Sequence, residues 1–169
     1  NLRRWDGLIR SYSLASVPSL DSFLEIHIKA VPNGQMTEWI FERMQTDLNL
    51  EFQGPQGHCY YRADVQDKPL LLIGTGTGLA PLLGIARDAL NSGHQANIYL
   101  YHGSRHPEGL YLDQELRALA NQHTQFNYIP CVSGPHVPEG FHPGRAHDIA
   151  LKQHQQLSEW TVYLCGHPE

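Results

Sequence analysis

Glycines alternate with threonines in the segment Gly74–Gly78, between an apolar run and the start of a helical pattern. The apolar residues 70–73 are typical of a short buried strand in a parallel sheet. Glycine lets the backbone turn tightly and approach a ligand, because no Cβ stands in the way. A helix that begins here offers free N–H groups and the positive end of its dipole. This combination predicts a site for phosphate or pyrophosphate, with Pro81 in the first helical turn, where its missing N–H costs nothing.

Two familiar nucleotide motifs do not fit this loop. No lysine follows the glycines, which argues against a P-loop ATPase or GTPase. Leu79 stands where the third glycine of G-x-G-x-x-G would fall, and residues 102–105 supply no acidic residue after the second strand. A tight turn without a ligand is the alternative for the loop alone. The pattern favours a dinucleotide that binds in a manner unlike that of ordinary dehydrogenases.

A strand–helix–strand pattern follows Pro69 and predicts a parallel sheet with helices on both faces. Strands are predicted over residues 70–73, 97–102, 126–132 and 161–165, and helices over 79–91, 110–121 and 145–156. Ligands of such sheets bind at the carboxyl ends of the strands. The segments expected at those ends are Gly74–Gly78, Gly103–Arg105, Ser133–Gly134 and Cys165–Gly166. Their convergence on one edge favours the nucleotide interpretation.

The residues before position 67 have a different pattern, that of short antiparallel strands with one small helix. Strands are predicted over 8–15, 23–31 and 48–52, and a helix over 36–45. Such elements are typical of part of a β-barrel. We therefore expect two domains, residues 1–66 and residues 67–169. Both ends of the sequence look truncated, so we expect the chain to be a fragment of a longer protein.

Composition argues against several classes of function. The net charge of −5 does not indicate a basic surface of the kind that binds nucleic acid, so nucleic acid is not an expected partner. No apolar run approaches the length that spans a membrane. Cys59, Cys131 and Cys165 match neither zinc nor iron–sulfur spacing, and they indicate thiols in a reducing compartment, with cytoplasm as the default. The histidines between residues 136 and 147 lie in a loop rich in proline and glycine, so no metal site is predicted.

Three segments stand in an order that resembles the ferredoxin–NADP reductase superfamily. They are an R-x-Y-S flavin motif at residues 10–13, a G-x-G-x-G-x-x-P nucleotide loop at 74–81 and a C-G-x-P ending at 165–168. The resemblance covers nearly the whole chain. It implies a partial FAD-binding β-barrel in residues 1–66 and an NAD(P)-binding α/β domain in residues 67–169.

On the flavin side, the resemblance implies that Arg10 pairs with the flavin phosphates, since a planar guanidinium suits bidentate phosphate contacts. Tyr12 would stack on the isoalloxazine ring, and Ser13 would hydrogen-bond near flavin N5. Family members also bind the flavin pyrophosphate at a G-x-x-[ST] turn that enters a helix. The residues implied at this turn are Gly34, Met36 and Thr37.

On the nucleotide side, the resemblance implies that residues 76–78 face the dinucleotide pyrophosphate and that Cys165 lies beside the nicotinamide. Cys165 is not expected to be a nucleophile, because nothing basic in the sequence is placed to activate it. Cys165 would help to hold the two rings about 3–3.5 Å apart for hydride transfer, and the resemblance thus implies Ser13 and Cys165 as the catalytic residues. The implied nucleotide contacts are Gly74, Gly76, Thr77, Gly78, Pro81, Gly103, Arg105, Cys165, Gly166 and Pro168.

The predicted nicotinamide cofactor is NADH, with NADPH the alternative. NADPH-dependent relatives often carry a Ser-Arg pair after the third strand, whose arginine contacts the 2′-phosphate, whereas Ser133 is followed by Gly134 here. Arg105 could substitute for that arginine. The segment from Gly103 to Leu116, however, resembles the NADH-using oxygenase reductases.

These observations lead to three hypotheses of function. The first is a flavoprotein reductase that passes hydride from NADH to FAD and then single electrons to an iron–sulfur protein or domain. The second is a flavin reductase that supplies reduced flavin to a partner oxygenase. The third is a catalytically silent nucleotide-binding module.

Overall fold

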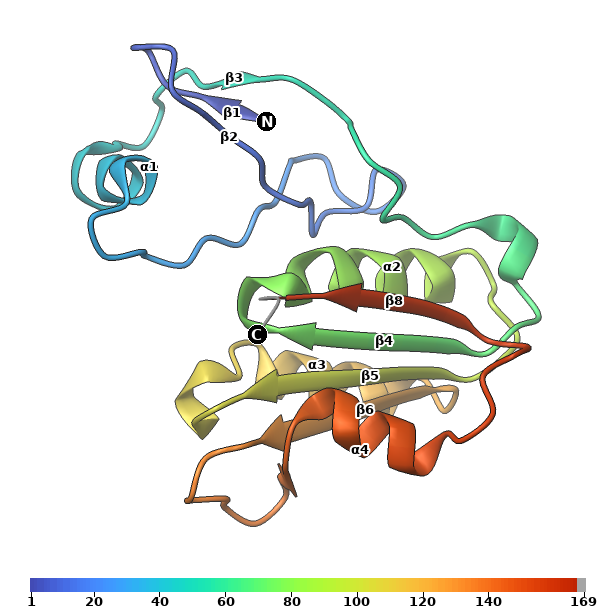
Figure 1. The fold of residues 1–169 in the computed structure, drawn as a ribbon. Coiled ribbons are helices and arrows are strands. Elements are labelled where there is room, and N and C mark those ends of the chain that lie inside the picture. Colours follow the sequence, from blue (N-terminus) through green and yellow to red (C-terminus); the bar gives the residue numbers. More distant parts are fainter. Residues whose placement is uncertain (167–169) are drawn as a thin grey trace.

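The computed structural model describes residues 1–166 and holds two sheets, each with its own helices (Figure 1). The predicted contact Pro168 lies outside the described residues. The predicted combination of an antiparallel β domain and a parallel α/β domain is confirmed. No helix within residues 1–166 is long and apolar enough to cross a membrane.

The larger sheet has five parallel strands in the order β7-β6-β5-β4-β8. The strands are β4 (Leu70–Thr75), β5 (Ile98–Ser104), β6 (Phe126–Val132), β7 (His142–Pro143) and β8 (Thr161–Cys165). Residues 70–73 are all buried, because β4 lies inside the sheet and helices cover both of its faces. The sequence does not predict β7, since two residues carry no periodicity.

Helices α2 and α3 cover one face of this sheet, and α4 covers the other (Figure 1). The helices are α2 (Leu79–Asn91), α3 (Asp113–Gln122) and α4 (Ala146–Gln153). Leu72 packs in one apolar cluster with Leu82 and Leu116 from α2 and α3. Ile73 packs in a second cluster with Ala150 from α4. This division follows from the strand geometry, in which successive side chains point to opposite faces.

The smaller sheet is antiparallel, in the order β2-β1-β3, and each strand has two residues. The strands are β1 (Leu2–Arg3), β2 (Ile9–Arg10) and β3 (Glu51–Phe52). Helix α1 (Gln35–Glu38) continues as a π-helix over Trp39–Arg43. Met36 and Trp39 pack against Leu2 in an apolar cluster, so the helix is held against the sheet.

Two strand predictions in the N-terminal part are wrong, and the strand predicted over 48–52 is limited to β3. Residues 8–15 form a strand only at β2, and residues 23–31 contribute one isolated bridge, between Leu14 and Ile26. Leu24, inside the segment predicted as a strand, is 61% exposed. An alternating pattern becomes a strand only where a neighbour accepts and supplies hydrogen bonds. Among residues 1–166 the segment 23–31 finds such a neighbour at a single pair.

Three helices differ from their predicted bounds. The helix predicted over 145–156 is shorter than expected, because α4 covers only Ala146–Gln153. The predicted helix over 36–45 is divided between α1 and the π-helix. The predicted helix over 110–121 begins three residues late, at Asp113. Leu112 has a φ of +59° and therefore cannot belong to a right-handed helix.

Candidate cofactor-binding site

The carboxyl ends of the parallel strands bring the predicted nucleotide residues to one edge of the sheet. β4 runs into Gly76–Gly78, which form a 3₁₀ turn before α2. Gly74 pairs with Cys165 across β4 and β8, so the end of β8 lies beside this turn (Figure 1). Arg105 and Ser133 follow β5 and β6 at the same edge.

The turn at residues 76–78 needs glycine at two positions. Gly76 has a φ of +53°, in the left-handed region that favours glycine, and a Cβ there would meet no atom within 4 Å. A Cβ at Gly78 would lie 2.3 Å from the Cys165 carbonyl oxygen, so only glycine allows the two backbones to approach this closely. Thr77 between them is half-buried. Open backbone at the start of a 13-residue helix fits a pyrophosphate group.

Three other predicted nucleotide residues pack elements together. A Cβ at Gly74 would lie 2.7 Å from Leu82 Cδ1, and Pro81 is buried in the first turn of α2. β5 ends two residues later than predicted, so Gly103 lies inside the strand. A Cβ at Gly103 would lie 2.9 Å from the Ala146 Cβ, so this glycine lets α4 approach the sheet. Their contact with a nucleotide stays a prediction.

Two predicted residues flank the turn at the same edge. Arg105 is exposed directly after β5 and places a cation there. Gly166 follows Cys165 with a φ of +156°, and a Cβ there would lie 2.2 Å from Thr75 Oγ1. The edge is therefore built from close backbone contacts, with one predicted cation beside them.

The R-x-Y-S motif lies on β2 and in the segment that follows it. Arg10 is exposed, and its Nη1 donates to the Ile9 carbonyl oxygen at 2.8 Å. Tyr12 is half-buried against the cluster around Met36, and burial raises its pKa. Ser13 is exposed. The predicted roles of these residues toward a flavin stay predictions.

The predicted pyrophosphate turn at residues 34–37 is held by the Thr37 side chain. The Thr37 hydroxyl donates to the Gly34 carbonyl oxygen at 3.0 Å and accepts from the Val31 N–H at 3.2 Å. A Cβ at Gly34 would lie 2.6 Å from Thr37 Oγ1, and Met36 is buried in the core. The Thr37 hydroxyl therefore stabilises the turn, which leaves backbone N–H groups as the anion contacts it can offer.

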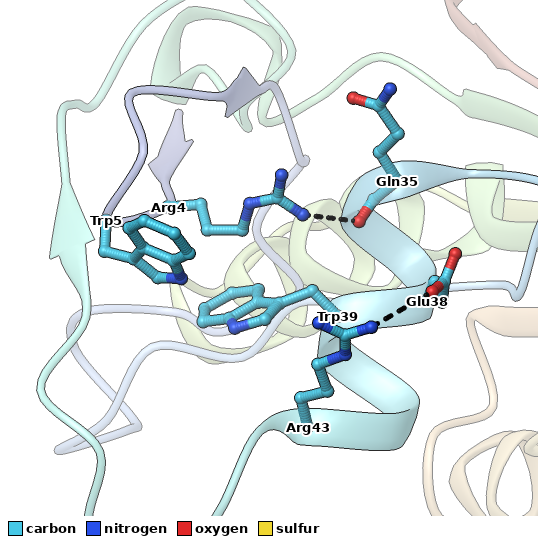
Figure 2. Close-up of a pocket in the computed structure, with 6 residues that line it drawn as sticks. All are labelled: Arg4, Trp5, Gln35, Glu38, Trp39 and Arg43. Atoms are coloured by element: carbon cyan, nitrogen blue, oxygen red, sulfur yellow. Dashed lines mark hydrogen bonds and ion pairs between the residues drawn. The ribbon is translucent and has the colours of Figure 1, made fainter.

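A pocket of about 430 Å³ lies beside α1 and was missed by the sequence reasoning (Figure 2). The Arg4 guanidinium donates to the Gln35 carbonyl oxygen at 2.8 Å, and Arg43 forms an ion pair with Glu38 at 3.6 Å. The pocket is lined by Arg4, Trp5, Gln35, Glu38, Trp39 and Arg43. No motif links these residues, because the turn after β1 and helix α1 meet only in the folded chain.

The two domains contact each other at α2 and at the segment before α3. Gly84 in α2 lies against the segment that follows the R-x-Y-S motif, since a Cβ there would be 3.2 Å from the Ala15 carbonyl oxygen. His27 Nδ1 is 2.8 Å from Tyr111 Oη, which joins the N-terminal part to the segment before α3. The segment that follows the R-x-Y-S motif therefore contacts the helix that begins after the glycine turn.

A buried histidine lies next to Tyr111 at this interface. His102 is fully buried in β5, its Nδ1 is 3.3 Å from Tyr128 Oη, and its Nε2 has no hydrogen-bond partner among residues 1–166. Burial lowers its pKa to about 4, against a smaller opposing effect of Asp113. His102 is therefore neutral at physiological pH. No group of three His, Cys, Asp or Glu side chains in the described residues could hold a metal ion.

Cys59 is a further residue near the site that the sequence does not predict. Its Sγ lies 3.6 Å from Cys165 Sγ, at the end of β8. A separation of 106 residues gives no signal in the sequence for such a contact.

The fold and the glycine turn define a two-domain nucleotide-binding oxidoreductase architecture, and known protein families match both parts. The family described as "Oxidoreductase NAD-binding domain" matches residues 72–169, and "Oxidoreductase FAD-binding domain" matches residues 3–61. The chain belongs to the ferredoxin reductase-like superfamily. It therefore carries domains of the types that bind FAD and a nicotinamide dinucleotide.

Similar proteins include reductases of bacterial oxygenase systems. The chain is 38% identical over 159 residues to the ferredoxin–NAD(P)⁺ reductase component of the naphthalene 1,2-dioxygenase system of Pseudomonas putida, across 94% of this chain and 48% of that protein. It is 30% identical to a probable flavin reductase of Vibrio harveyi, across 92% of this chain and 68% of that protein. The solved structure of the Amycolatopsis reductase GcoB matches with a TM-score of 0.89 and 34% identity, across 99% of this chain and 51% of that one. The chain spans about half the length of most of these relatives.

Proposed function

We propose that this chain forms part of a flavoprotein reductase that takes hydride from NADH onto FAD and passes single electrons to an iron–sulfur protein or domain. FAD would supply the conversion between two-electron and one-electron transfer. The contribution of the protein is to bind both cofactors and to fix their spacing.

The observation that carries this proposal is the contact between the segment after the R-x-Y-S motif and the helix that follows the glycine turn. Ala15, two residues after the motif, lies against Gly84, and Gly84 is in α2, which begins at Leu79. The rise of an α-helix is about 1.5 Å per residue, so this contact lies within about 10 Å of the helix start. Such spacing favours a reaction between two bound rings over two independent sites.

Different residues of the chain would contact the two cofactors. The backbone of Gly76–Gly78 would bind the dinucleotide pyrophosphate, since open N–H groups at a helix start favour anions. Arg10 would neutralise the flavin phosphates. Tyr12 and Cys165 would pack beside the two rings, and Ser13 would donate near the flavin N5. We place the boundary of the two domains at residues 66/67.

The electron acceptor is inferred from relatives. The Pseudomonas putida relative is named as a reductase component for ferredoxin, which supports an iron–sulfur partner. The Vibrio harveyi relative is named a probable flavin reductase, which supports release of reduced flavin as the second candidate. For the compartment we propose the cytoplasm, since all three cysteines are free thiols.

An anaerobic titration with NADH tests the proposal. The purified protein, loaded with FAD, is expected to lose its flavin absorbance at about one equivalent of NADH, because one hydride reduces one flavin. Added ferredoxin should then reoxidise the flavin. A spectrum unchanged by NADH would contradict the proposal and favour the silent module. Flavin that is lost on gel filtration would favour the flavin reductase.

A further inference from the structure

Two thiols from distant parts of the chain are in contact beside the glycine turn. Cys59 lies in the exposed segment that leads from β3 toward β4, and Cys165 is the last residue of β8. Their sulfur atoms are 3.6 Å apart. The Tyr163 hydroxyl also donates to the Tyr60 carbonyl oxygen at 3.0 Å, so a second bond holds the same two segments together.

We propose that Cys59 and Cys165 form a reversible disulfide and that this modification closes the nucleotide site. The disulfide itself follows from the position of the two sulfur atoms. Its effect on nucleotide binding rests on the proposed function, because Cys165 is expected to lie beside the nicotinamide.

The geometry requires only a small movement. A disulfide holds its sulfur atoms about 2.05 Å apart, so the two atoms need to approach by about 1.5 Å. Cys59 lies in an exposed segment without regular structure, which can make this adjustment. Cys165 is paired into the parallel sheet through its neighbours and stays in place.

The electrostatics make Cys59 the reactive partner. The hydrogen bond with the Cys165 thiol lowers the pKa of Cys59 to about 7, and the same contact raises the pKa of Cys165. The thiolate is the nucleophilic form, and Cys59 is exposed to solvent. Cys131 is excluded, because it is buried and burial raises its pKa to about 12.

The oxidant would be a hydroperoxide, in two steps. The Cys59 thiolate attacks one peroxide oxygen, the O–O bond breaks, and a sulfenic acid and a hydroxide ion form. The Cys165 sulfur then attacks the Cys59 sulfur, and the sulfenic oxygen leaves as water with the proton of the Cys165 thiol. Overall two thiols and one hydrogen peroxide give one disulfide and two waters. A dithiol reverses the reaction by thiol–disulfide exchange.

The disulfide would act on the glycine turn through close contacts. Gly78 lies against the Cys165 carbonyl oxygen, where a Cβ would be 2.3 Å away. Gly166, the next residue, packs against Thr75 at the end of β4. Because Cys165 stays in place, the disulfide would act by covering this surface, since the bonded Cys59 side chain would lie over the Cys165 sulfur directly beside the turn.

Thiol counting after controlled oxidation tests the disulfide. The reduced protein has three free thiols. After hydrogen peroxide, the wild type and Cys131→Ser are each expected to lose two thiols, and a peptide map should join the peptides that contain Cys59 and Cys165. Cys59→Ser, a change at an exposed position, should form no such link. A peroxide-treated wild type that keeps three thiols, or that links other cysteines, would overturn the proposal.

NADH binding to the same samples tests the effect on the site. Oxidised wild type is expected to bind NADH at least about tenfold more weakly than reduced wild type, with recovery after dithiothreitol. Cys59→Ser should bind NADH equally well before and after peroxide. A disulfide that leaves NADH affinity unchanged would overturn the closure of the site. A reduced protein that binds no NADH would instead contradict the proposed function, while the thiol count would still decide whether the disulfide forms.

Discussion

Arg87 in α2 holds Asp21 through two hydrogen bonds, one of 2.9 Å from Nη1 to Oδ2 and one of 2.8 Å from Nη2 to Oδ1. The Arg87 guanidinium lowers the pKa of Asp21, and the Val17 N–H also donates to its carboxylate at 2.7 Å. A bidentate pair of this kind fixes orientation as well as distance. It joins the segment after the R-x-Y-S motif to the helix that begins after the glycine turn, and would thereby fix the spacing of the two proposed cofactor sites.

Arg87→Ala is therefore expected to slow the reduction of FAD by NADH about tenfold or more, because a shift of about 1 Å between reacting groups is costly. Stopped-flow absorbance without oxygen measures this rate. Arg62→Ala is the matched control, since Arg62 pairs with Asp64 within one exposed segment. Equal rates in the two variants would contradict the role of the Arg87–Asp21 pair.

Sequence patterns predict the parts of this fold that depend on local periodicity. The buried strand at residues 70–73, the glycine turn and α2 agree with prediction, since each depends on residues within one short segment. The prediction for residues 23–31 is wrong because a strand depends on a neighbour that local alternation does not specify. The contact of Cys59 with Cys165 depends on how the two domains pack, and the pocket beside Trp39 depends on a turn meeting a helix.

Gly78→Ala is expected to weaken NADH binding at least about tenfold and to lower the free energy of unfolding by about 1–3 kcal/mol, as overpacked sites do. The new Cβ would lie 2.3 Å from the Cys165 carbonyl oxygen and would push the turn away from β8. Fluorescence titration with NADH and urea unfolding measure the two effects. Gly54→Ala is the control, because its Cβ would have no neighbour closer than 3.8 Å. A normal NADH affinity in Gly78→Ala would show that NADH binding does not need the close approach of the turn to β8.

Because His102 is buried, we expect the folded chain to lose stability in mild acid. Burial lowers its pKa from 6.5 to about 4 in the folded chain, so the unfolded chain binds more protons between these values. The contribution of neutral His102 to the free energy of unfolding should be fully present above pH 6.5. It should be lost, by about 3 kcal/mol in total, as the pH drops toward 4. Urea unfolding at several pH values measures this slope. The slope should be smaller in His102→Gln and unchanged in His136→Gln, where the histidine is exposed. An equal slope in all three proteins would exclude His102 as the cause.

The space around Gly134 favours NADH over NADPH. Gly134 stands at the position where NADPH-dependent relatives often carry arginine. A Cβ at Gly134 would lie 2.3 Å from the Arg105 carbonyl oxygen, so a larger residue cannot enter without moving the segment after β5. The 2′-phosphate of NADPH therefore has only Arg105 as the predicted cation at this edge. NADH should reduce the flavin faster than NADPH at equal concentration.

Arg105→Ala separates the two roles that this arginine could have. Arg105 is exposed, so its side chain is not required for packing. If it contacts only a 2′-phosphate, the variant should keep kcat/KM for NADH and lose about tenfold or more for NADPH, the cost of a charge-assisted contact of about 1.5–3 kcal/mol. Lys152→Ala, at an exposed position in α4, is the control for a general loss of positive charge. A faster reaction with NADPH than with NADH in the unaltered protein would refute the proposed preference, whatever the variant does.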